Sequence, residues 1–229
     1  MTPWAWLIRR LLPVPVPGPE PPKPEPLSIQ GHFLRGPGTA YQRSQNHGYR
    51  FAVDPRFIVI HFTGGSAFQS SVDFLCEPTT QASAHVVIAR DGRITQLVPF
   101  HTIAWHADPS HWLSYCMLNP HSIGIELDNP GELHLDSGRP MTWYGRHVAW
   151  QDAEYRAHKH GSGVTWWHTY TSQQIAQTEA LCRLLMDLYQ IDDILGHDDI
   201  APGRKRDPGP AFPMDELRVR LGLPGRAQA

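Results

Sequence analysis

Two histidines and an aspartate, carried by two well-separated segments, are the residues of this sequence best suited to bind a metal ion. His197 and Asp207 lie in the segment GHDDIAPGRKRDPGPAF, residues 196–212, and His61 ends the apolar run FIVIH. Catalytic zinc usually takes three nitrogen, oxygen or sulfur ligands from the protein and leaves its fourth position open to water. These residue types therefore predict one bound Zn2+ and hydrolytic chemistry.

Two further ionisable residues could take part in that chemistry. Glu126 lies inside the apolar pattern SIGIEL, where a buried carboxylate needs a partner or a function because burying it unpaired is costly. It could accept the proton of an attacking water and pass it to a leaving amine. Lys205, two residues before Asp207, could stabilise the charge that develops on a carbonyl oxygen.

Each of these residues also has a structural interpretation when it is considered alone. His61 could be a satisfied core or surface histidine, and His197 and Asp207 could cap their loop. Glu126 could pair with an arginine, and Lys205 stands between two arginines as one of three solvated charges. The catalytic interpretation therefore depends on all five residues coming together.

Strands and helices alternate along the chain that must position these residues. Apolar, β-branched runs predict strands that end near His61 and His197, and the residues around Glu126 form a third. Asp91-Gly92 predicts a hairpin turn, Ser66 a helix cap, and Thr171 with Gln174 a capping box. The proline-rich segment after Gly196 predicts a fixed loop rather than a helix. The expected strands are 57–60, 84–89, 94–98, 121–127 and 191–195, and the expected helices are 66–77, 171–190 and 213–221.

This order predicts an α/β fold with a mixed central sheet flanked by helices, in a single catalytic domain. We expect residues 1–50 to form a tail with a proline-rich linker, and residues 51–229 to form the domain, with an insertion around 130–170. The three cysteines are odd in number and contain no CxxC pair, which argues against a disulfide framework.

Composition excludes several classes of partner. The 20 basic and 22 acidic residues give a net charge of −2, so no nucleic-acid partner is expected. The segment Met1 to Leu12 is too short to span a bilayer and makes a poor secretory signal, because its two arginines follow the first apolar residues. The expected location is therefore the cytoplasm by default, with periplasmic, extracellular or phage-lytic action as alternatives.

Five motifs occur in the order FIVIHFTGG, SAHVVIARDGRITQLVPF, AWHA, SIGIELDN and GHDDIAPGRKRDPGPAF. Together they resemble the zinc-dependent N-acetylmuramoyl-L-alanine amidases, a group that includes peptidoglycan recognition proteins and some phage lysins. Within that group the sequence most closely resembles the bacterial anhydromuramyl-peptide amidases and their cell-wall relatives. The resemblance covers residues 56–221, and the last motif is the most specific of the five.

The resemblance implies a function and a set of site residues. The expected reaction is hydrolysis of the amide between N-acetylmuramic acid and L-alanine of the peptidoglycan stem peptide, in intact wall or in a soluble muropeptide. Zinc would be bound by His61, His197 and Asp207, with Glu126 and Lys205 as catalytic groups. The matching positions also imply substrate contacts, from Trp105, His106, Asn129, Arg204 and His85. The alternatives are a muropeptide-binding module without catalysis, and a zinc peptidase that cuts within the stem peptide.

Overall fold

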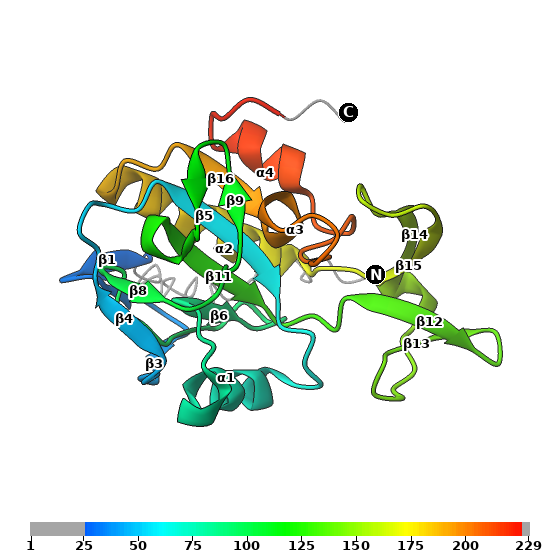
Figure 1. The fold of residues 1–229 in the computed structure, drawn as a ribbon. Coiled ribbons are helices and arrows are strands. Elements are labelled where there is room, and N and C mark those ends of the chain that lie inside the picture. The colour runs from blue at the N-terminus through cyan, green and yellow to red at the C-terminus, as the bar shows by residue number, and fades with distance from the viewer. Residues whose placement is uncertain (1–25, 226–229) are drawn as a thin grey trace, which may run out of the picture.

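A six-stranded mixed sheet lies at the centre of the protein (Figure 1). The computed structural model describes residues 26–225. The strand order is β16-β5-β11-β6-β7-β3, and all neighbours are parallel except the β6–β7 hairpin. This arrangement confirms the predicted mixed α/β class. The strands are β3 (Thr39–Tyr41), β5 (Phe57–Phe62), β6 (Val86–Ile88), β7 (Ile94–Gln96), β11 (Ser122–Leu127) and β16 (Asp193–Gly196).

Residues 26–50 are part of the folded unit rather than a tail. β3 is an edge strand of the central sheet, paired with β7, so the expected domain start near Phe51 is too late. The strands of residues 26–50 are three or four residues long, and glycine-containing turns separate the first three, which hides any alternation in the sequence. The predicted segment Met1 to Leu12 and nearly all of the proline-rich stretch lie outside the described residues. The other short strands are β1 (Ser28–Gln30), β2 (Phe33–Arg35), β4 (His47–Arg50), β8 (Thr102–Ala104), β9 (His111–Trp112) and β10 (Tyr115–Cys116).

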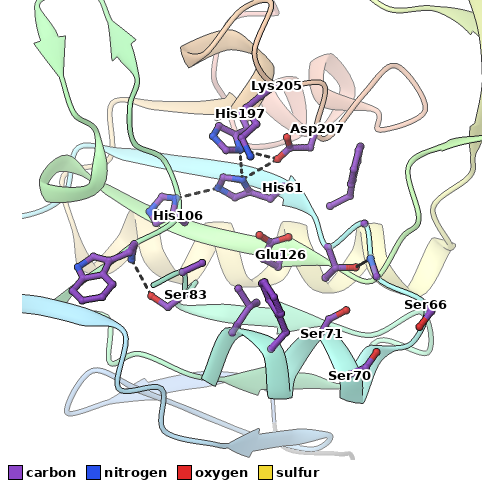
Figure 2. A pocket seen from close by; sticks show the side chains of 18 of the residues that line it. His61, Ser66, Ser70, Ser71, Ser83, His106, Glu126, His197, Lys205 and Asp207 are labelled. Atoms are coloured by element: carbon purple, nitrogen blue, oxygen red, sulfur yellow. Dashed lines mark hydrogen bonds and ion pairs between the residues drawn. The ribbon is translucent and has the colours of Figure 1, made fainter. Parts of the chain in front are cut away.

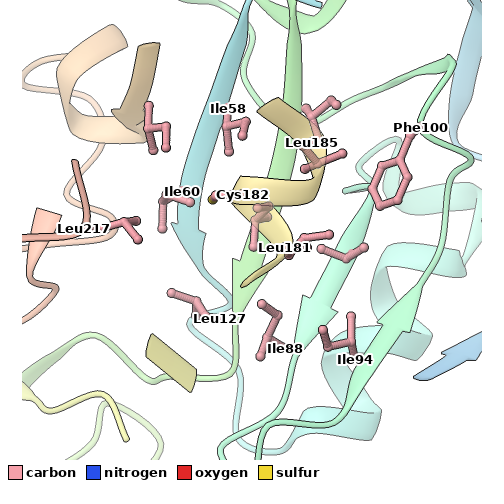
Figure 3. Close-up of a cluster of buried hydrophobic side chains, with 14 of the residues drawn as sticks. Ile58, Ile60, Ile88, Ile94, Phe100, Leu127, Leu181, Cys182, Leu185 and Leu217 are labelled. Atoms are coloured by element: carbon pink, nitrogen blue, oxygen red, sulfur yellow. The ribbon is translucent and has the colours of Figure 1, made fainter. Parts of the chain in front are cut away.

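Alternation along the central strands separates the core from the site. Ile58 and Ile60 of β5 point to the face covered by the long helix α2 (Ser172–Leu188), where they pack with its buried Leu181 and Leu185 (Figure 3). Because successive side chains of a strand point to opposite faces, His61 lies on the other face. The same alternation in β11 places Ile125 in the core and Glu126 opposite. The register partners His61 and Glu126 therefore lie together on the face of the sheet opposite α2.

The helices begin and end close to the predicted positions, with two corrections. The capping box of Thr171 and Gln174 is present at the start of α2, as predicted. Ser66 does not cap α1 (Phe68–Cys76); its N-cap is Ala67, without a side-chain hydrogen bond. The segment after Gly196 is not all loop, since α3 (His197–Ile200) forms one turn before the first proline. The last helix is α4 (Met214–Arg220), and short 3-10 turns span Pro78–Thr80, Asn119–His121 and Trp150–Asp152.

The predicted insertion folds into a sheet of its own, beside the central one (Figure 1). We call this four-stranded unit, with the order β13-β12-β15-β14, the insertion sheet. Tyr155 and Trp166 are register partners, as are Glu154 and Trp167, so the two pairs lie on opposite faces. Within residues 26–225 no helix has the length and apolar character needed to cross a bilayer. The strands are β12 (Glu132–Asp136), β13 (Arg139–Met141), β14 (Ala153–Ala157) and β15 (Val164–His168).

Candidate active site

Parallel strands bring the candidate catalytic residues to one edge of the sheet. β5, β11 and β16 run in the same direction, so their carboxyl ends meet there. His61 and Glu126 are register partners on β5 and β11. His197 directly follows the last residue of β16, and the chain returns after α3 to place Asp207 beside it. Three distant segments thus supply one site, as the sequence predicts.

The three predicted metal ligands form a close, buried triangle (Figure 2). His61 Nδ1 lies 2.9 Å from His197 Nδ1, and both nitrogens lie 2.9 Å from Asp207 Oδ2. The residues are 1%, 3% and 7% exposed, respectively. Hydrogen bonds alone do not account for this convergence, because two ring nitrogens and one oxygen compete for the same small space. A cation held between the three atoms accounts for it, so the residues present fit a metal ion.

The electrostatics of the triangle also suit a cation. Burial, and then the neighbouring His197, lower the pKa of His61 to about 4, so its ring is uncharged at neutral pH. Burial acts to raise the pKa of Asp207, but hydrogen bonds from His197 and His61 outweigh it and hold that pKa below its usual value. Uncharged imidazoles and an ionised carboxylate are the forms that coordinate metals.

His106 holds the ring of His61 from behind. His61 Nε2 lies 3.0 Å from His106 Nδ1, so a His61 whose Nδ1 faces a metal carries its hydrogen on Nε2 and donates it to His106. His106 packs on Gly124 so closely that a Cβ there would lie 2.5 Å from the imidazole ring. The predicted contact residue His106 therefore lies against a ligand, although its side chain also lines the pocket.

Glu126 and Lys205 both line the pocket beside the triangle (Figure 2). The Oε2 atom of Glu126 is buried without a hydrogen-bond partner among the described residues. Burial raises the pKa of Glu126 to about 8, with a further increase from the charge of Asp207 and a decrease from Lys205. A carboxyl with a pKa near neutral can both accept and release a proton, as a general acid–base group must.

The pocket encloses about 580 Å³ and opens over the triangle. Helix α1 and the turn after β5 form one side, and the half-exposed Trp105 stands at the rim, where the sequence places a contact residue. Trp143 of the insertion forms another part of the wall and donates its Nε1–H to Gly64 O at 2.7 Å. The aromatic composition of the insertion is visible in the sequence, but nothing in one sequence shows which tryptophan reaches the cleft.

Three residues predicted to contact substrate do not line this pocket. His85 is fully buried; its Nε2 donates to Thr102 O, and its Nδ1 accepts from Gly124 N–H. Asn129 is also buried and binds backbone atoms at both ends of the insertion. Arg204 bonds to the carbonyls of Ala107 and Pro109. The polar atoms of His85 and Asn129 are used by the backbone, so these two side chains support the walls of the site. Arg204 is exposed, and both of its hydrogen bonds come from Nη2.

The mixed sheet and the buried His-His-Asp group beside an unpaired carboxyl are typical of hydrolases of the α/β class with a candidate metal site. The sequence model of the N-acetylmuramoyl-L-alanine amidase family matches residues 51–210, and the chain belongs to this family. The chain is 36% identical over 160 residues to the 1,6-anhydro-N-acetylmuramyl-L-alanine amidase AmpD of Escherichia coli. The aligned residues make up 69% of this chain and 68% of AmpD.

A second relative is the N-acetylmuramoyl-L-alanine amidase AmiD of Escherichia coli. It is 33% identical over 199 residues, which are 77% of this chain and 62% of AmiD. The structure of AmiD in complex with anhydro-N-acetylmuramic acid-L-Ala-D-γ-Glu-L-Lys superposes with a TM-score of 0.57 and 27% identity, over 87% of this chain and 66% of that one. The described fold, including the strands before Phe51, is therefore comparable with that of a substrate-bound amidase.

Proposed function

We propose that this protein is a zinc-dependent N-acetylmuramoyl-L-alanine amidase, which cleaves the amide between N-acetylmuramic acid and L-alanine of the peptidoglycan stem peptide. The convergence of His61, His197 and Asp207 beside an unpaired Glu126 carboxyl is the observation that carries the proposal. Two imidazoles and one carboxylate are a known catalytic zinc set, although non-haem iron also uses it. Membership of the amidase family favours zinc.

Glu126, Lys205 and His106 have different roles in the proposed reaction. Zinc, when bound, supplies a Lewis acid that polarises the scissile carbonyl and activates water. Glu126 accepts the proton of the attacking water and then delivers it to the leaving amine of alanine, so the amine departs uncharged. Lys205 donates a hydrogen bond to the carbonyl oxygen as negative charge develops there. His106 holds the ring of His61 in the required tautomer.

Two measurements test this function. Elemental analysis of the purified protein should find one zinc per chain. Mass spectrometry of a digested soluble muropeptide should find a free stem peptide that begins with alanine. A folded, metal-free and inactive protein would instead indicate a binding module, and fragments cut within the stem peptide would indicate a peptidase. A parallel digest of intact wall shows which form of the substrate the enzyme uses.

A further inference from the structure

The insertion sheet contacts the segment that carries two of the three metal ligands. We call residues 196–210 the ligand loop. Its two ends are joined by a backbone hydrogen bond from Asp198 N to Asp207 O, at 2.8 Å. Several contacts from outside the loop come from one face and one hairpin turn of the insertion sheet, and among these the contacts of Lys159 are the shortest.

His158 links the two sides of the ligand loop through a single nitrogen. Its Nε2 lies 3.1 Å from Asp198 Oδ2 and 3.1 Å from Arg206 O. Its Nδ1 accepts a hydrogen bond from the backbone N–H of His160, so the ring hydrogen lies on Nε2 and can be shared between the two oxygens. Asp198 follows the ligand His197, and Arg206 precedes the ligand Asp207. The 2%-exposed His158 ring therefore fastens the neighbours of two ligands together.

Lys159 adds an electrostatic contact to the same end of the loop. Its Nζ lies 2.8 Å from Asp198 Oδ1 and 2.6 Å from Asp199 Oδ1. Asp199 in turn accepts the backbone N–H of Gly196 through Oδ2 at 2.7 Å, which fixes the start of α3. Asp198 is buried and Lys159 is partly exposed, so the pair is screened less than one on the surface.

Trp167 supports the other end of the loop. Gly209 passes over its ring so closely that a Cβ would lie 2.8 Å from it. The guanidinium of Arg206 lies 5.1 Å from the centre of the Trp167 ring and pairs with Glu132 at 2.9 Å. The ligand loop is thus contacted on one side by residues from β12, from β15 and from the turn between β14 and β15.

We propose that the insertion sheet positions the ligand loop for metal binding, with His158 as the positioning residue. The inference rests on the metal site of the proposed function, but not on the reaction itself. Metal ligands must be held within a few tenths of an ångström, and their supporting partners affect affinity even when they never touch the metal. A loop containing three prolines still needs these contacts because its own backbone closes it with few bonds.

Zinc affinity of the full-length protein, measured against a series of chelators, tests the proposal without an activity assay. His158→Phe keeps a ring of similar shape but donates nothing, and should weaken zinc binding by about 10-fold or more. His158→Gln can place an amide N–H near the position of Nε2 and should stay within about three-fold of wild type. The matched control is His160→Phe, at an exposed position of the same turn, which should leave the affinity unchanged.

A second variant keeps the test decisive if His158→Phe does not fold. Lys159→Met removes only the ion pairs of a partly exposed residue and should weaken zinc binding by about three-fold or more. Wild-type affinity in folded His158→Phe, or in Lys159→Met when the first variant is insoluble, overturns the positioning role. Failure of the wild-type protein itself to bind zinc contradicts the proposed function, so the two failures can be told apart.

Discussion

Replacing Glu126 by glutamine should stabilise the metal-free protein at alkaline pH. Burial raises the pKa of Glu126 from 4.5 to about 8, so between those values the folded state keeps a proton that the unfolded state releases. This contribution of the wild-type residue to stability is greatest below pH 4.5 and falls as the pH rises to about 8. The full change corresponds to about 5 kcal/mol. Because the carboxyl faces a pocket that water can enter, we expect about 2–3 kcal/mol.

Denaturant unfolding in the presence of a chelator, at about pH 5, 7 and 8.5, measures this effect. The difference in the free energy of unfolding between Glu126→Gln and wild type should grow with pH, since only wild type ionises. The control Glu216→Gln changes an exposed glutamate of α4, and its difference from wild type should not grow. With zinc restored, Glu126→Gln should bind the metal but lose about 10²–10⁴ in rate. A stability difference that is constant across this pH range would refute the reasoning.

Three further predictions concern the candidate site and the buried His85 behind it. Lys205→Ala should retain zinc and lose about 10²–10³ in kcat, and an unchanged kcat in muropeptide hydrolysis excludes the proposed oxyanion contact. His61→Ala, His197→Ala and Asp207→Ala should each lose zinc and activity; a full zinc content in any of them, by elemental analysis, contradicts its role as a ligand. His85→Leu leaves Gly124 N–H and Thr102 O without their partner, and should destabilise the protein by about 2–4 kcal/mol at neutral pH. Burial lowers the pKa of His85 to about 3, so the unfolded state takes up a proton below pH 6.5 that the folded wild type does not. His85→Leu lacks this effect. The difference in the free energy of unfolding between wild type and His85→Leu, measured by denaturant unfolding, should therefore become smaller as the pH falls.

The convergence of the candidate metal ligands could be predicted in part because strand ends are visible in a sequence. The run FIVI predicts a buried strand, and its last residue must emerge at the edge where other parallel strands end. The same reasoning locates His197 after β16. Asp207 and Lys205 were candidates by residue type, and the family resemblance supported them, because a loop with several prolines does not reveal which side chains turn inward.

The contact residues were harder to predict for a physical reason. His85 precedes a strand in which every residue is buried. The sequence does not show that both ring nitrogens of His85 form hydrogen bonds with backbone atoms. Asn129 follows a buried strand by two residues, where a ligand could also lie, yet it hydrogen-bonds to the backbone at the two ends of the insertion. His158 lies in a polar stretch without periodicity, so its burial follows only from the way the insertion folds back on the ligand loop.

Asn129 also ties together the two ends of the insertion, at the place where the insertion leaves the central sheet. Its amide donates to the carbonyls of His168 and Thr169, its side-chain oxygen accepts from Gly131 N–H, and His168 N donates to Gly131 O at 3.0 Å. The start of the insertion, at residues 129–131, and its end, at residues 168–169, therefore lie side by side. We expect that a segment of another length exchanged between these anchors leaves β11 and α2 in place but weakens zinc binding unless it restores the contacts of His158 and Lys159 with the ligand loop.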